Sequence, residues 1–195
     1  MKREAEILRE TRETRVELRI DLDGEGKTKL ETPIGFLNHM LDQLGFHGGF
    51  DLTVKATGDT HIDCHHTVED IGICLGQALL QALGDRKGIR RYAHAYVPMD
   101  ETLARAVIDL SGRPDFVFDG QFSTPALGEL QTQMIPHFFK SFAIASKSTL
   151  HMSILYGQND HHKCEALFKA LARSLRDAVA RSDSGSVAST KGWMD

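Results

Sequence analysis

The sequence predicts a single α/β domain built from two similar halves, each with helices covering one face of a mostly antiparallel or mixed sheet. Three observations predict it. The segment 13–24 recurs as 101–112, with Glu-Thr at its start and Ile-Asp-Leu-x-Gly at its end. The motif His-His-x-x-Glu occurs at 65–69 and again 96 positions later at 161–165. The pattern of expected strands and helices repeats as well, which indicates a fused duplication, because solenoids usually need three or more units.

The two repeats are expected at residues 7–90 and 91–181, within one domain that spans 1–195. A short basic loop joins them, so no flexible linker separates the halves. A chain of 195 residues with 41% hydrophobic content can bury a substantial common core. Residues 182–195 form a C-terminal tail that begins with a Ser/Gly-rich stretch.

In the first half, residues 16–22 are rich in β-branched and apolar residues and end in an Asp-Gly turn, which predicts a strand. Apolar residues then recur every three or four positions from 34 to 46, which predicts a helix. A short strand over 50–56 and a longer helix over 66–83 follow. The expected order is strand, strand, helix, strand, helix.

The second half repeats this order. A strand is predicted over 104–110, ending in Ser-Gly, and a helix over 130–145. A strand over 149–156 and a longer helix over 161–181 complete the half. Each long helix therefore begins close to one of the histidine pairs.

Composition excludes several classes of protein. A formal charge of −4 argues against nucleic-acid binding. The N-terminus is charged and lacks the apolar core of a signal peptide, and no run approaches the ~18 apolar residues of a membrane span. Three cysteines without CxxC spacing, Cys64, Cys74 and Cys164, are expected to be reduced and to act as packing residues. We expect a soluble, cytoplasmic protein.

The paired histidines have the spacing of metal ligands. Residues four apart share a helix face, so His65 and Glu69 can bind one ion and His161 and Glu165 another. Adjacent residues diverge by about 100° around a helix, so each second histidine must point elsewhere. An exchange under pseudo-twofold symmetry predicts two sites. One is His65, Glu69, His137 and His162, and the other is His161, Glu165, His39 and His66. The sequence leaves open whether the exchange occurs within a chain or between subunits.

Helix capping alone is the competing explanation for the second motif, because Asp160 is a good N-cap residue. Capping accounts neither for Glu165 nor for the duplicated pair. Three imidazoles and one carboxylate per ion favour Mn²⁺ or Fe²⁺, and Zn²⁺ accepts the same ligands. The duplication therefore predicts a pair of bound metal ions, one for each matched set of ligands.

The chain resembles the imidazoleglycerol-phosphate dehydratase family through five motifs in the family's order. These are Phe-Leu-Asn-His-Met-Leu at 36–41, Asp-Cys-His-His-Thr-Val-Glu-Asp at 63–70, Pro-Met-Asp-Glu at 98–101, Asn-Asp-His-His-Lys-x-Glu at 159–165 and Ser-Thr-Lys-Gly at 189–192. Together they extend over nearly the whole chain. No ligand position of the family pattern is missing.

The resemblance implies a carbon–oxygen hydro-lyase of histidine biosynthesis. Its fold would be two duplicated βαββ-type halves of the ribosomal protein S5 domain 2-like class, assembled as a homo-24-mer with Mn²⁺ at subunit interfaces. The reaction would convert D-erythro-imidazole glycerol phosphate to imidazole acetol phosphate. Two metal ions would hold the ring as imidazolate, whose electrons expel the adjacent hydroxyl to leave a diazafulvene intermediate.

The resemblance also implies roles for further residues. Glu13 would be the catalytic acid/base. Alternatively, Glu13 is only an exposed glutamate at the start of a strand. Glu101, the equivalent residue of the second repeat, could by its position have the same catalytic role. Phosphate-binding positions would be Arg91, Arg113, Lys169, Ser189 and Lys191, and further substrate-binding positions would be Gln43 and Met99. The tail at 182–195 is expected to become ordered over the bound phosphate.

Two other functions remain open. Another dinuclear metal enzyme could use the same ligands to activate water, although such sites usually hold their ions about 3.5–4 Å apart through bridging carboxylates. A metal-storage shell protein would need the metals but neither Glu13 nor the cationic residues. Glu13 therefore distinguishes a catalyst from a storage protein.

Overall fold

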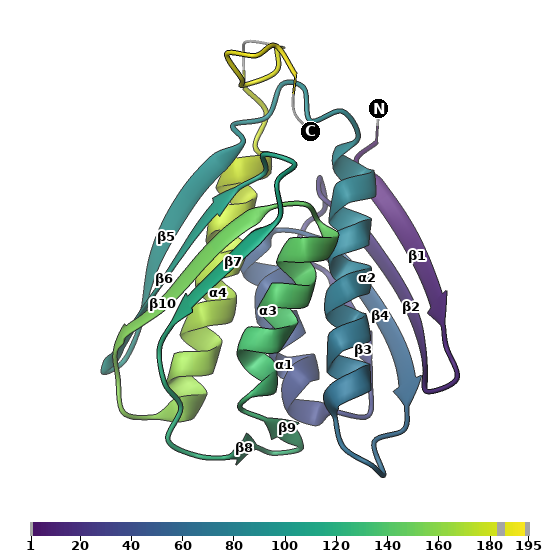
Figure 1. Ribbon diagram of the computed structural model, residues 1–195, viewed down its shortest axis with the longest axis vertical. Coiled ribbons are helices and arrows are strands. Elements are labelled where there is room, and N and C mark those ends of the chain that lie inside the picture. The colour runs from purple at the N-terminus through teal and green to yellow at the C-terminus, as the bar shows by residue number, and fades with distance from the viewer. Residues whose placement is uncertain (1, 183–185, 194–195) are drawn as a thin grey trace.

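The protein is described by a computed structural model that covers residues 2–182 and 186–193. Four helices form a central layer, and a four-stranded sheet covers each side of it (Figure 1). The duplicated sandwich expected from the sequence is confirmed. No helix of the described residues has the length and apolar character needed to cross a membrane.

The first half contributes one sheet and two helices. Its strands are β1 (Glu4–Glu10), β2 (Thr14–Asp21), β3 (Thr28–Glu31) and β4 (Asp51–Gly58), in the order β1-β2-β4-β3. Its helices are α1 (Gly35–Gly48) and α2 (His65–Leu83). Neighbouring strands are antiparallel except β3, which is parallel to β4, so the sheet is mixed.

The second half repeats this arrangement with one addition. Its strands are β5 (Tyr92–Met99), β6 (Thr102–Asp109), β7 (Asp115–Asp119) and β10 (Thr149–Tyr156), in the order β5-β6-β10-β7. Its helices are α3 (Met134–Ala145) and α4 (Asp160–Val179). The addition is a small hairpin of β8 (Ala126–Leu127) and β9 (Leu130–Gln131).

Two expectations from the sequence are wrong in detail. Each half has a third strand before its short helix, β3 and β7, which the expected element order omitted. Both are short edge strands whose residues are nowhere fully buried, so their hydrophobic signal is weak. The helix expected over 130–145 begins only at Met134, because Leu130 and Gln131 pair with β8 instead.

Helices of one half pack against helices of the other half. The long helix α2 lies on β1 and β2, and α4 lies on β5 and β6. The short helix α1 of the first half packs on α4 of the second, and α3 of the second half packs on α2 of the first. Each long helix thus meets the short helix of the other repeat, which unites the two halves in one core.

Glycines permit the close approach of α2 and α3. A Cβ built on Gly76 would lie 2.5 Å from the carbonyl oxygen of Phe142, and one on Gly72 would lie 2.9 Å from that of Phe138. At the corresponding position of α4, 96 residues after Gly72, stands Phe168, whose ring centre lies 4.7 Å from that of Phe139. The position of α4 that corresponds to Gly72 therefore carries a large aromatic side chain that is buried in the core. The three cysteines are buried free thiols, as expected of packing residues.

Candidate metal centres

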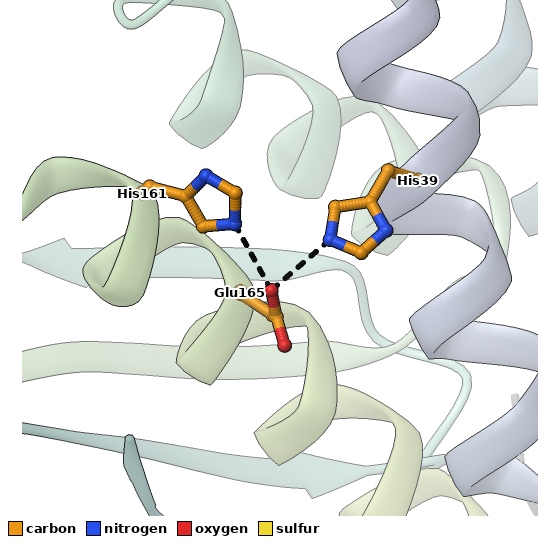
Figure 2. A group of neighbouring side chains, drawn as sticks. All are labelled: His39, His161 and Glu165. Carbon is orange, nitrogen blue, oxygen red and sulfur yellow. Dashed lines mark hydrogen bonds and ion pairs between the residues drawn. The ribbon is translucent and has the colours of Figure 1, made fainter. Parts of the chain in front are cut away.

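The first centre lies where α1 meets α4 (Figure 2). Nε2 of His39 is 3.1 Å and Nε2 of His161 is 3.2 Å from the same oxygen, Oε2 of Glu165. Phe36 packs edge-on against His161, with 5.1 Å between ring centres. Two imidazole nitrogens and a carboxylate from both repeats thus converge on one point.

The carboxylate of Glu165 is held ionised in this centre. Its side chain is only 8% exposed, and its other oxygen accepts from Nζ of Lys169 at 2.5 Å. Burial raises the pKa of Glu165, but the hydrogen bond and charge of Lys169, together with the bonds to His39 and His161, outweigh burial and lower it. Lys169 therefore neutralises the centre from the side opposite the histidines.

The second centre lies where α3 meets α2 and contains His65, Glu69 and His137. Nε2 of His137 is 2.9 Å from Oε1 of Glu69, and the rings of His65 and His137 lie 4.9 Å apart between centres. One ligand atom from each of the three residues lies within 4.8 Å of the others. This centre repeats the first with the roles of the halves exchanged.

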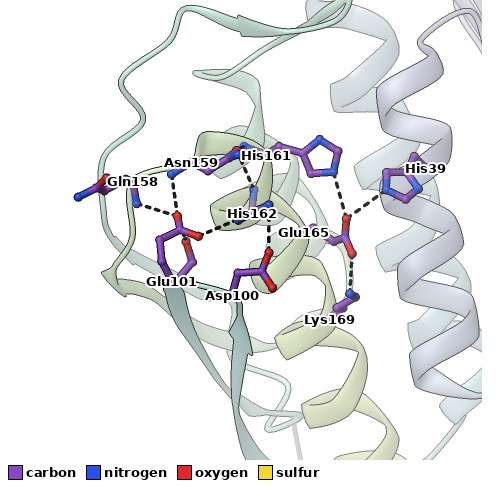
Figure 3. Close-up of polar contacts among 10 residues, drawn as sticks. His39, Asp100, Glu101, Gln158, Asn159, His161, His162, Glu165 and Lys169 are labelled. Carbon is purple, nitrogen blue, oxygen red and sulfur yellow. Dashed lines mark hydrogen bonds and ion pairs between the residues drawn. The ribbon is translucent and has the colours of Figure 1, made fainter.

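His66 and His162 belong to neither group within one chain. Nδ1 of His162 lies 2.7 Å from Oε2 of Glu101, on the side of α4 away from His161 (Figure 3). Nδ1 of His66 lies 3.0 Å from Oδ2 of Asp59. The expectation that adjacent histidines point in different directions agrees with this arrangement, whereas an exchange of His66 and His162 within a single chain does not.

These contacts shift two pKa values. Backbone hydrogen bonds from Asn159 and Gln158, with the bond from His162, hold the pKa of Glu101 well below its ordinary range. The bond to Asp59 raises the pKa of His66, although partial desolvation opposes it. Sequence reasoning missed Asp59, for which the chain offers no signal, and considered Glu101 only as the repeat mate of Glu13.

Local hydrogen bonds to neighbouring side chains fix the backbone at both histidine pairs. The backbone N–H of His65 donates to Oδ1 of Asp63 at 2.7 Å, and that of His161 donates to Oδ1 of Asn159 at 2.9 Å. Asp160, expected from the sequence as a possible cap, instead pairs with buried Lys163 and accepts from the backbone of the loop before β8. The start of each helix is thus fixed independently of any ligand.

Glu13 lies beside His66 in the turn between β1 and β2. Its Oε2 is 4.0 Å from Nδ1 of His66, and its side chain is 55% exposed. The turn that carries it is held by Oγ1 of Thr11, which accepts from the backbone of Glu13 and Thr14. Oγ1 of Thr14 in turn donates to Asp70 on α2. The backbone of Glu13 is therefore anchored while its carboxylate stays accessible.

Four of the expected phosphate-binding residues line one hollow: Arg91, Arg113, Ser189 and Lys191. Within it, Arg91 pairs with Asp109 through two nitrogens, at 2.7 and 3.0 Å, and donates to the carbonyl of Ala188 at 2.6 Å. The pairing with Asp109 raises the pKa of Arg91. Arg91 thus ties the described part of the tail to the body of the protein. Residues 183–185 and 194–195 of the expected tail lie outside the described residues.

The remaining expected substrate contacts lie apart from this hollow. Lys169 is at the first metal centre rather than with the other cations. Gln43 lies half-buried on α1, one turn after His39. Met99, at the end of β5, is partly buried against the core. A packing role accounts for Met99 without a ligand.

Within one chain the hollow is far from the metal centres. The backbone N–H of Arg91 donates to the carbonyl of Ala178 near the end of α4, whereas His161 lies at its start. These positions are 17 residues apart, about 25 Å at 1.5 Å per residue. Figure 1 shows the same separation, with the tail and the starts of α2 and α4 at opposite ends.

The fold and the centres together define a class of protein: a duplicated two-sheet sandwich with a histidine–glutamate cluster at each contact between its halves. The model of the imidazoleglycerol-phosphate dehydratase family matches residues 32–175. Proteins of that name from Exiguobacterium sp. and Xanthobacter autotrophicus are 50% and 55% identical, over 99% and 98% of each chain respectively.

Solved structures agree with the sequences. Imidazoleglycerol-phosphate dehydratase from Staphylococcus aureus superposes with a TM-score of 0.83 at 38% identity, over 92% of this chain and 99% of that one. The enzyme from Pyrococcus furiosus gives 0.81 at 33% identity, over 96% and 100%. The chain belongs to the imidazoleglycerol-phosphate dehydratase family of hydro-lyases.

Proposed function

We propose that the protein dehydrates D-erythro-imidazole glycerol phosphate to imidazole acetol phosphate in histidine biosynthesis, using two Mn²⁺ ions per subunit in the cytoplasm. The observation that carries the proposal is the pair of matched centres, each with two imidazoles and one carboxylate drawn from both repeats. The choice of reaction follows from family membership. The paired centres support it, because two metal ions could hold the imidazole ring of the substrate.

The donor set fits a divalent ion. In the first centre two Nε2 atoms approach one oxygen of a carboxylate that is nearly buried and ionised. Such a convergence of nitrogen donors on one carboxylate suits a cation of intermediate softness. His66 and His162 would complete the coordination when they are supplied by neighbouring copies of the chain.

The reaction removes a hydroxyl beside the imidazole ring and a proton from the next carbon. The two ions, when held by the residues of the two centres, would act as Lewis acids that polarise the imidazole ring and favour loss of the hydroxyl. Glu13 would take the proton, because its carboxylate is exposed beside His66 and its backbone is fixed. The enol that results would tautomerise to the ketone.

Binding of the phosphate would use the hollow lined by Arg91, Arg113, Ser189 and Lys191. Backbone and cationic donors there suit a dianion. The distance of about 25 Å between this hollow and the centres of the same chain supports a site completed by neighbouring subunits. A homo-24-mer with its metal ions at subunit interfaces is part of this proposal.

The proposal is tested by stripping metal from the protein with a chelator and measuring turnover of imidazole glycerol phosphate before and after adding Mn²⁺. Bound metal is counted per chain in the same samples. Recovery of turnover at about two ions per chain is expected from the two centres.

A metal-storage protein would give a different result. It would take up two ions per chain without dehydrating the substrate, under conditions in which the Staphylococcus aureus enzyme does so. That outcome would leave the metal centres standing and contradict the proposed reaction.

A further inference from the structure

Glu101 makes four contacts that fix its carboxylate beside His162 (Figure 3). Oε1 accepts from the backbone N–H groups of Gln158 and Asn159 at 3.0 and 2.8 Å and from the hydroxyl of Thr102 at 3.0 Å. Oε2 is left for Nδ1 of His162 at 2.7 Å. A carboxylate with all these donors is ionised and can only accept, so Nδ1 of neutral His162 carries the hydrogen.

The free nitrogen of His162 is then a ligand atom. With the hydrogen on Nδ1, the lone pair of a neutral imidazole is on Nε2. Nε2 points away from Glu101, with the exposed carboxylate of Asp100 3.8 Å away. His162 is thus held in the tautomer that leaves the lone pair of Nε2 available to a ligand.

Asp59 performs the equivalent task for His66 but comes from a different place in the repeat. Six residues (59–64) separate Gly58 from His65, whereas only three (158–160) separate Gly157 from His161. Asp59 lies in this longer loop, and its Oδ2 is 3.0 Å from Nδ1 of His66. The side chain of Asp59 is only 13% exposed, so the atoms packed around it limit its movement.

We propose that Glu101 and Asp59 are positioning residues that hold His162 and His66 as Nδ1–H tautomers with Nε2 directed at the metal ions. This inference rests on the proposed function, because it assumes that both histidines ligate. Carboxylate partners of this kind raise the basicity of a ligating imidazole and fix its orientation.

The inference also accounts for the choice between Glu13 and Glu101. In the second half, Glu101 accepts hydrogen bonds from the backbone of Gln158 and Asn159 and from His162. In the first half Asp59 orients the histidine and Thr14 donates to Asp70 rather than to its neighbouring glutamate. Glu13 is thereby left available for proton transfer.

Glu101→Gln tests the tautomer directly. The backbone donors from Gln158 and Asn159 would keep the amide oxygen in the Oε1 position, so the amide NH₂ would face His162. An NH₂ group can only donate, so Nδ1 would have to accept and Nε2 would carry the hydrogen. The substitution keeps the shape and the backbone hydrogen bonds and removes the ligand atom.

Two measurements report the effect of the substitution, one on the tautomer of His162 and one on metal affinity. The ring ¹⁵N shifts of His162 in metal-free protein, assigned by their loss in His162→Gln, report the tautomer. Competition with a chelator reports the affinity for Mn²⁺. We expect Glu101→Gln to move the hydrogen of His162 to Nε2. It should also lower the affinity for one of the two Mn²⁺ ions about 10–100-fold. Asp59→Ala should lower the affinity for the other ion. Glu31→Gln, which changes an exposed carboxylate, is the control and should bind both ions as tightly as wild type.

The proposal is overturned if Glu101→Gln retains the wild-type tautomer or binds both ions as tightly as wild type. Equal weakening in Glu31→Gln would also overturn it, because the effect would then not depend on His162. Wild-type protein that binds two ions but fails to dehydrate the substrate would contradict only the proposed function, so the two failures are distinguishable.

Discussion

The two halves of the protein use the same Glu-Thr pair in opposite ways. Glu101 is fixed by three hydrogen bonds and by His162, and its side chain is 39% exposed. Among the described residues, the carboxylate of Glu13 forms an ion pair with His66 alone, at 4.0 Å, and its side chain is 55% exposed. The difference arises from a loop that is three residues longer before α2 and supplies Asp59. A duplicated site can therefore divide two tasks between its copies by a change outside the repeated motif.

The strongest test of this comparison removes one centre at a time. Glu69→Ala and Glu165→Ala should each leave about one ion per chain and abolish detectable turnover, because the proposed reaction uses both metal ions to polarise the imidazole ring of the substrate. Metal content and turnover are measured together, with Glu25→Gln as an exposed control that loses only the ion pair with Lys27. Retained turnover in either variant would show that the centres are not equally required.

Acidification should remove both ions. Ligating imidazoles must be neutral, and their ordinary pKa is about 6.5, so metal should be released as the pH falls through about 6. The lowered pKa of Glu165 means that its carboxylate stays charged there and is protonated only at lower pH. Bound metal is followed by equilibrium dialysis across this range. Release only below about pH 4 would assign the loss to the carboxylates instead.

Glu13→Gln separates proton transfer from metal binding. It should lower kcat about 10²–10⁴-fold with metal content and assembly unchanged, because general acid–base catalysis contributes that much. Excess Mn²⁺ should not restore it, whereas the loss in Glu101→Gln should be partly restored. Rescue of Glu13→Gln by metal would place Glu13 with the positioning residues.

Truncation after Ser186 tests the phosphate hollow. The change removes Ser189 and Lys191 and should raise KM about 10–100-fold, as expected from the loss of charge-assisted hydrogen bonds worth 1.5–3 kcal/mol. Metal content should not change, because all eight proposed metal ligands precede the truncation point in the sequence. Unchanged kinetics would exclude the tail from the substrate site.

The smallest expected effect concerns the helix interfaces. Gly76→Ala adds a Cβ within 2.5 Å of the carbonyl oxygen of Phe142 and should lower the free energy of unfolding by about 1–3 kcal/mol. Gln81→Ala, on the exposed side of α2, is the control and should change it by less than about 0.5 kcal/mol. Chemical denaturation measures both. Equal stability would show that α3 can move aside at no cost.

Much of the fold could be predicted because its patterns are local. Apolar residues alternate along β2 and recur every three or four positions along α1. Both patterns depend only on residues that are close together in the sequence. The edge strands β3 and β7 could not, since four or five half-exposed residues carry little pattern, and their parallel partners β4 and β10 follow only after a helix. The hairpin before α3 was missed for the same reason.

The sequence by itself determined the duplication and the facing of His65 with Glu69 and of His161 with Glu165, since a helix places residues four apart on one side. Only the tertiary structure decided that Asp59 orients His66, that Glu101 is occupied by His162, and that the cationic hollow lies far from the centres of its own chain. Helical spacing follows from hydrogen bonds between near neighbours. The contact between Glu101 and His162 joins residues 61 positions apart and depends on how the whole chain packs.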